Sequence, residues 1–199
     1  AGDGNIAVNI TQPEGGTVTV YNESAYHTLT VDIPENVTAN QQLADNEYFT
    51  LTAPSEVVNK EDSGAEGKFE SGISNNSIEV RNNGTKQPEY VAKADGILTL
   101  YLRFVDHKQI TCENMTDGTM VQKYINNTEI AGTTQENKYE AVTFNVEAGK
   151  TYEFYTNGGT GRMFGVKYST TDYPQSTSQL MVNSGDTIRI VAEPDQYYI

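Results

Sequence analysis

Hydrophobic and polar residues alternate along much of this chain, and the alternation is clearest between Asn137 and Ser169. Two glycine-containing segments, AGK and NGGTGR, divide this stretch into three runs. The apolar positions of the three runs are Val142, Phe144 and Val146, then Tyr152 and Phe154, then Phe164, Val166 and Tyr168. A period of two residues bounded by glycine turns predicts β-strands with one buried face. The stretch therefore predicts three antiparallel strands that direct these side chains into a core.

A further strand is predicted at Ile97–Phe104, which reads ILTLYLRF. Side chains two residues apart point to the same face of a strand. One face of this run is apolar and holds Leu98, Leu100, Leu102 and Phe104. Tyr101 and Arg103 lie on the other face with Thr99. The leucines predict a core stripe, and Tyr101 and Arg103 are expected on the outer face.

Shorter runs with the same pattern predict the remaining strands. They lie within residues 5–21, 27–33, 48–53, 69–80, 89–92, 108–112, 119–125 and 179–199. Turn residues separate them, for example Pro13–Gly16 and Asn82–Gly84. No stretch of ten or more residues has helical periodicity. The pattern predicts an all-β protein built as an antiparallel β-sandwich, of the jelly-roll or immunoglobulin-like kind.

The charge of the chain narrows the possible partners. Thirteen basic residues stand against 27 acidic ones, which gives a formal net charge of −14. Nucleic acid binding needs Lys and Arg to displace counterions from phosphates, so we expect no nucleic acid partner. The same repulsion disfavours acidic polysaccharides unless calcium or a local basic patch offsets it. Neutral ligands are compatible with this charge, and no apolar run is long enough to insert into a membrane.

The sequence contains no motif that predicts catalysis. HExxH, paired CxxC, P-loop and GxSxG patterns are all missing, and no pair of catalytic acids can be selected from 27 carboxylates. Cys112 is the one cysteine, and its place beside Ile110 in a strand-like run favours a buried position over a nucleophilic role. We expect a protein that is not an enzyme.

The charged loop at residues 57–67 allows two interpretations. Its oxygen-bearing side chains Glu61, Asp62, Ser63 and Glu66 are ligand types that Ca²⁺ accepts. Their spacing matches no known calcium loop, so a solvated surface loop is the other and preferred interpretation. We therefore expect no cofactor, with calcium left open.

Two segments carry a resemblance to a known class of proteins. They are ADGILTLYLR at Ala94–Arg103 and VEAGKTYEFYTNGGTGRMFGVKYS at Val146–Ser169. With these segments, the region from about Tyr48 to Ser169 resembles the β-sandwich carbohydrate-binding modules of secreted Firmicutes polysaccharide-degrading proteins. The resemblance implies a sandwich at residues 46–169 that binds polysaccharide, in an extracellular or cell-surface location.

The chain ends resemble a different class. ITQPEGGTVTVY near the start and VNSGDTIRIVAEPDQYYI at the end are similar to the short β-repeats of Gram-positive surface proteins. Residues 1–45 and 170–199 are therefore expected either to form one discontinuous β-element or to belong to a single larger sandwich. We expect the domain to be a monomer and to be part of a larger multidomain protein.

Sugar recognition needs an apolar platform for the ring and fixed polar groups for its hydroxyls. The chain has no Trp, so Tyr must supply the platform. The candidate ligand-binding residues are Tyr101, Arg103, His107, Lys123, Tyr124, Tyr155 and Arg162. Each tyrosine has an alternative role, because an outward Tyr often packs against a cross-strand neighbour or under a covering loop.

These observations predict a non-catalytic extracellular module that binds a plant polysaccharide by Tyr stacking and polar hydrogen bonds. A neutral glucan, either starch-like or a β-glucan, is favoured over an acidic glycan. The alternative is an adhesin or structural spacer domain of a bacterial cell-surface protein.

Overall fold

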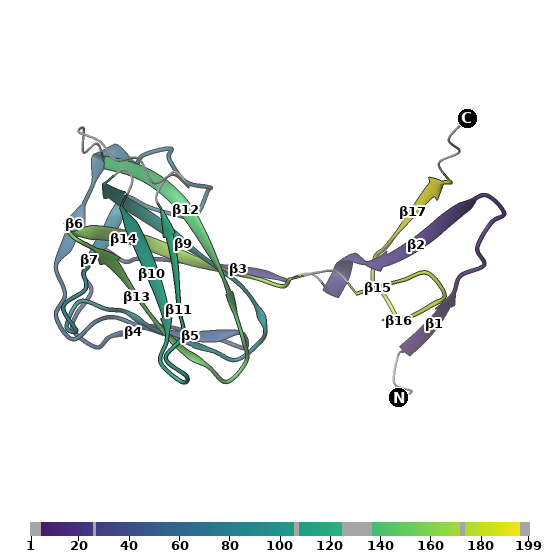
Figure 1. Cartoon of the computed structure of the whole chain (residues 1–199), viewed down its shortest axis with the longest axis horizontal. Helices are drawn as coiled ribbons and strands as arrows, with labels where there is room; N and C mark the ends of the chain where they lie inside the picture. Colours follow the sequence, from purple (N-terminus) through teal and green to yellow (C-terminus); the bar gives the residue numbers. More distant parts are fainter. Residues whose placement is uncertain (1–4, 26, 106–107, 125–136, 172–173, 196–199) are drawn as a thin grey trace. The chain divides into compact units, whose positions relative to one another are not determined.

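The computed structural model describes residues 5–25, 27–105, 108–124, 137–171 and 174–195. These residues form antiparallel β-sheets and contain no α-helix (Figure 1). The predicted all-β class is confirmed. The chain divides into two compact units, one made of residues 28–169 and one made of the two chain ends, residues 1–27 and 170–199.

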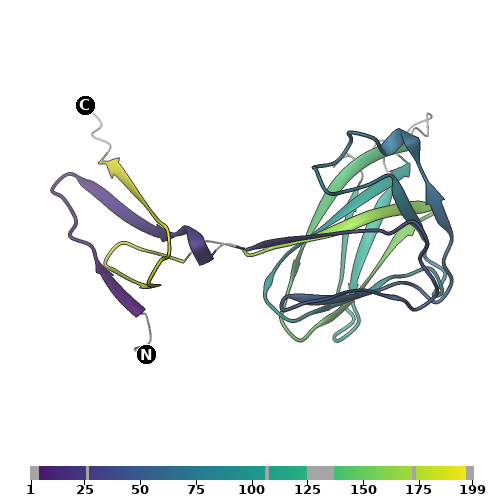
Figure 2. The same ribbon diagram turned by 180° about the vertical axis from the view of Figure 1, so that it is seen from behind.

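The larger unit is a sandwich of two antiparallel sheets (Figures 1 and 2). The strands of the first sheet are, in spatial order, β11 (Met120–Tyr124), β10 (Gln109–Asn114), β13 (Thr151–Asn157), β8 (Glu89–Ala92), β5 (Phe49–Thr52) and β4 (Gln42–Asp45). Those of the second are β12 (Asn137–Val146), β9 (Gly96–Val105), β14 (Gly161–Ser169), β7 (Asn76–Val80) and β6 (Asn59–Glu61), with β3 (Thr28–Asp32) also paired to β14. Short 3₁₀ turns lie at Glu23–Ala25 (η1) and Ser63–Ala65 (η2).

The main core lies between these two sheets. The predicted leucine stripe is buried within it, since Leu98, Leu100, Leu102 and Phe104 are each at most 1% exposed. Burying one such side chain contributes roughly 1.5–3 kcal/mol. This stripe therefore accounts for a large part of the stability of the sandwich.

One predicted core residue lies elsewhere. Strand β14 has a bulge between Met163 and Gly165, so Met163 and Val166 face the main core while Phe164 points to the opposite face. Phe164 is fully buried, but in a second cluster outside the sandwich. The prediction that Phe164 joins the main core is wrong because an inserted residue reverses the alternation.

The sandwich also begins earlier in the chain than residue 46. Strands β3 and β4 precede that residue, and both hydrogen-bond to strands of the larger unit. Strand β3 lies against β14 because Gly165 leaves room for it: a Cβ at this position would come within 2.5 Å of the Val31 carbonyl oxygen. The larger unit therefore starts at Thr28.

The two chain ends form the small additional β-element that the sequence predicts. Strand β1 (Asn5–Asn9) pairs with β16 (Gln179–Asn183), and β2 (Gly16–Asn22) lies between β15 (Gln175–Ser176) and β17 (Ile188–Pro194). Its core is small and is formed by Val20, Leu180 and Val182. No described helix is long and apolar enough to cross a membrane.

Candidate functional site

The predicted site residue Tyr101 lies on the outer face of β9, as expected, but it is covered. Its side chain is 3% exposed and packs edge-on against Phe69, with 5.4 Å between ring centroids. Phe164 and Ala65 complete this outer cluster. Tyr101 therefore packs under a covering loop, which is the alternative role considered above, and its ring has no face accessible to a ligand.

Arg103 lies beside Tyr101 on the same strand and is committed to an ion pair. Its Nη1 donates to the Asp62 carboxylate at 2.7 Å. Asp62 also accepts from the Gly64 amide and from the Tyr139 hydroxyl. Burial alone would raise the pKa of Asp62, but these donors and the charge of Arg103 lower it below its usual value.

These contacts also bear on the calcium interpretation of the loop at residues 57–67. Asp62 holds the loop to β9 and caps the 3₁₀ turn η2. Within the described ranges, no three His, Cys, Asp or Glu side chains lie close enough together to hold a metal ion.

Two further predicted residues are buried on the outer faces of the sheets. Tyr155 is 6% exposed, and its hydroxyl donates to the Glu113 carboxylate at 2.8 Å. Arg162 is 8% exposed and lies next to Arg103 across the strand pair, 4.0 Å from Glu79. The predicted ligand residue His107 lies outside the described residues.

Lys123 and Tyr124 are the two predicted residues that line an accessible recess. They lie on β11, the outermost strand of the first sheet, opposite β12, the outermost strand of the second. The Lys123 ammonium donates to the Thr143 carbonyl and lies 5.2 Å from the centre of the Phe144 ring. A pocket of about 240 Å³ lies between these two strands, and we call it the seam pocket. Its lining residues are Lys123, Tyr124, Glu140, Ala141, Val142 and Thr143.

A second and larger recess lies further along the same two strands. We call it the edge pocket; it has a volume of about 310 Å³. Its lining residues are Cys112, Asn114, Asp117, Thr119, Val121, Phe144, Asn145, Glu147 and Tyr152. Cys112, Phe144 and Tyr152 form a buried, mostly apolar wall, while Val121 is 52% exposed at the rim. The edge pocket thus combines an apolar wall with hydrogen-bonding groups, as sugar sites require.

The polar rim of the edge pocket is held in place by its own hydrogen bonds. Asp117 accepts from the Thr119 hydroxyl at 2.7 Å, from the Thr119 amide at 3.0 Å and from the Asn114 side chain at 3.1 Å. The hydrogen bonds from Thr119 lower the pKa of Asp117, and the charge of Lys150 lowers it further. Burial acts in the opposite direction but does not cancel these effects. The carboxylate is therefore ionised at neutral pH and already oriented as an acceptor.

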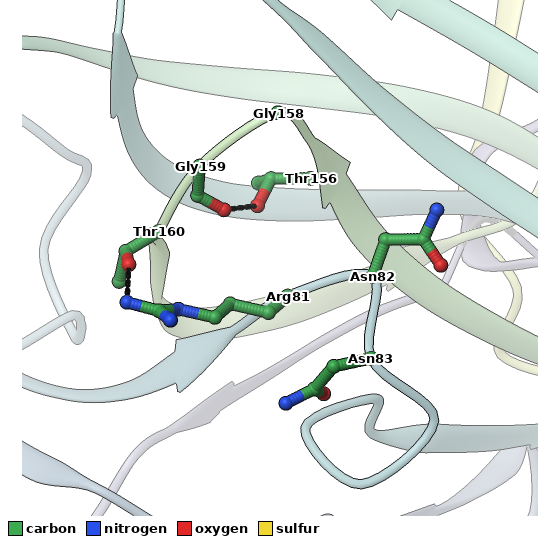
Figure 3. A pocket seen from close by; sticks show the side chains of 7 residues that line it. All are labelled: Arg81, Asn82, Asn83, Thr156, Gly158, Gly159 and Thr160. Atoms are coloured by element: carbon green, nitrogen blue, oxygen red, sulfur yellow. Dashed lines mark hydrogen bonds between the residues drawn. The ribbon is translucent and has the colours of Figure 1, made fainter.

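A third recess, the loop pocket, lies where the β7–β8 connection meets the β13–β14 hairpin (Figure 3). It has a volume of about 340 Å³ and is lined by Arg81, Asn82, Asn83, Thr156, Gly158, Gly159 and Thr160. The Thr156 hydroxyl donates to the Gly159 carbonyl at 2.9 Å and fixes the hairpin.

Most of the residues around these pockets are not predictable from the sequence. Nothing in the local pattern shows that β11 and β12 face each other. Four polar residues of the edge pocket therefore resemble ordinary turn and strand-end residues: Asn114, Asp117, Asn145 and Glu147. The sequence predicts turns at Asn82–Gly84 and in the NGGTGR segment, but the sheet topology determines that these two turns lie close together.

No protein-family model matches this chain, and comparison with curated proteins gives no match.

Proposed function

We propose that the larger unit is a non-catalytic carbohydrate-binding domain of an extracellular protein, and that it binds a neutral glycan along the seam between β11 and β12. The observation that carries the proposal is the edge pocket, where an apolar wall and oriented polar groups surround one recess. The predicted stacking platforms Tyr101 and Tyr155 have no part in it, because both rings are buried.

The recognition would use two kinds of contact. The C–H face of a sugar ring would pack against Val121, which is 52% exposed at the rim of the edge pocket, and this contact would replace water on apolar surface. Sugar hydroxyls would donate to the Asp117 and Glu147 carboxylates and exchange hydrogen bonds with Asn145. Hydrogen bonds to charged acceptors contribute about 1.5–3 kcal/mol each, more than those between neutral groups.

The local charge supports a neutral ligand. Among the residues that line the two pockets, Asp117, Glu140 and Glu147 are acidic and Lys123 is basic. An acidic sugar would meet like charge here, in addition to the repulsion from the whole chain. A glucan, starch-like or β-linked, has hydroxyls to donate and no charge.

The arrangement of the pockets supports a chain rather than a single sugar. The edge pocket and the seam pocket follow one another along the same pair of strands, and Lys123 lies between them with its bond to Thr143. Consecutive sugar residues could occupy consecutive pockets.

The non-catalytic part of the proposal is supported by the state of the thiol in the edge pocket. Burial raises the pKa of Cys112 to about 12, so the thiol is protonated at neutral pH and is a poor nucleophile.

Affinity electrophoresis in gels containing soluble starch, β-glucan or another neutral plant polysaccharide tests the proposal. The variant Asn145→Ala combined with Glu147→Gln changes two exposed rim residues and should abolish retardation. Asn82→Ala, in the loop pocket, is the matched control and should migrate as the unchanged protein does. Lack of retardation in every neutral gel would reject the proposal and favour the adhesin or spacer alternative.

A further inference from the structure

The loop pocket differs in charge from the seam. Arg81 is the one charged residue among those that line it, whereas two carboxylates line the edge pocket and one carboxylate and one ammonium line the seam pocket. The remaining lining groups are the amides of Asn82 and Asn83, two threonines and two glycines. The loop pocket is therefore cationic, although the chain as a whole has a net charge of −14.

The guanidinium of Arg81 is fixed in position. Its Nε pairs with Glu79 Oε1 at 2.9 Å, and its Nη2 donates to the Thr160 hydroxyl (Figure 3). The side chain is nevertheless 46% exposed, and no hydrogen bond within the described part of the chain engages Nη1. Arg81 therefore presents a fixed donor to whatever enters the pocket.

The group that holds Arg81 is itself buried and shared. Glu79 is 6% exposed, and the same Oε1 accepts from the buried Lys86 ammonium at 2.8 Å. Its other oxygen lies 4.0 Å from Arg162. The single buried carboxylate of Glu79 therefore pairs with three cations. Among the described ion pairs of this cluster, the one other carboxylate is Glu56, which lies 3.1 Å from the Lys86 ammonium.

The cluster consequently carries a positive excess of one charge, from three cations and two carboxylates. Arg162 is the least satisfied of the three cations, because its buried Nε and Nη1 have no hydrogen-bond partner within the described residues. An anion that reached Arg81 would balance the excess. Arg recognises planar oxyanions with high geometric specificity.

We propose that the loop pocket is a second binding site, specific for a sugar that carries a carboxylate, such as a uronic acid residue at a chain end. The carboxylate pairs with Arg81, and the amides of Asn82 and Asn83 contact the hydroxyls. The volume of about 340 Å³ is at the small end of the range for ligand sites. Beyond about 8 Å at physiological salt, the negative charge of the rest of the chain is screened from one bound acid.

The test compares sugars that differ by one group. Isothermal titration of the full chain with glucuronic acid and with glucose, and with galacturonic acid and galactose, isolates the carboxylate. We expect each acid to bind at least tenfold more tightly than its neutral partner at physiological salt, where the Debye length is about 8 Å. Arg81→Gln should remove the preference, and Arg81→Lys should restore part of it, because the charge returns without the planar fork.

The controls separate this site from the seam. Asn145→Ala with Glu147→Gln should leave acid binding unchanged, and Arg81→Gln should leave neutral glycan binding unchanged; thermal unfolding verifies that each variant is folded. Equal affinity for acid and neutral sugars would overturn the inference while sparing the proposed function. Inorganic phosphate that binds as tightly as the sugar acids would also overturn it, since the pocket would then accept any oxyanion.

Discussion

Three glutamates lie directly opposite one another on the outer face of the first sheet. Glu153 on β13 pairs with Glu113 on β10 on one side and with Glu89 on β8 on the other. Like charges at directly opposed positions of a sheet are destabilising, by an amount comparable to the 0.2–1 kcal/mol of a favourable pair. Glu153→Gln removes both repulsions, so we expect it to raise the free energy of unfolding at pH 7 by about 0.4–2 kcal/mol.

The effect has a defined pH dependence. Burial first, and then the charges of Glu89 and Glu113, raise the pKa of Glu153 above the ordinary Glu value of 4.5. The folded chain therefore holds this proton more tightly than the unfolded chain does. The free energy of unfolding then falls as the pH rises from about 4.5 through the raised pKa, and the full penalty is present above it. The advantage of Glu153→Gln should be complete at pH 7 and absent near pH 4.

Urea unfolding at both pH values measures this difference. Glu61→Gln is the matched control, because it makes the same change in net charge on the exposed strand β6, opposite Asn76. Equal stability of the two variants at pH 7 would contradict this prediction, and so would a gain from Glu153→Gln that persists at pH 4.

Three further substitutions test the packing. Leu100→Ala, in the middle of the core stripe, should lower the free energy of unfolding by about 2–5 kcal/mol in urea unfolding. Gly165→Ala would place a Cβ 2.5 Å from the Val31 carbonyl oxygen, so it should displace β3 and cost about 1–3 kcal/mol, with loss of amide hydrogen-exchange protection in β3 as the direct readout. Tyr155→Phe removes the hydrogen bond to Glu113 and should cost about 1–2 kcal/mol in thermal unfolding, with glycan retardation in gels unchanged.

The fold class could be predicted from the sequence because the alternation that marks each strand lies within a few neighbouring residues. Leu98, Leu100 and Leu102 are buried as their period of two predicts, and the chain ends form the expected β-element. The alternation failed at Phe164, where a single bulge residue reverses which side chains face the core. Period alone cannot reveal such an insertion, since both Met163 and Phe164 are apolar.

The candidate sites depended on information that is not local. Alternation correctly placed Tyr101 on the outer face, but the residue that covers it, Phe69, comes from a segment that reads as an ordinary loop and strand. The sequence predicts a binding role for Lys123, but its contacts depend on β12, which lies opposite β11 because both are outermost strands of their sheets. A residue's face follows from its own strand, whereas its accessibility follows from the topology.

Charge acts on this chain at two different ranges. The net charge of −14 governs encounter at long range, and it disfavours any long polyanion. Binding is decided within a few ångströms, where Arg81, Lys86 and Arg162 outnumber the carboxylates that serve them. A single acidic sugar can therefore bind to a chain that repels an acidic polymer. If so, the affinity for uronic acid oligomers should fall as the oligomer lengthens, and this decline should disappear when salt screens the outer charges.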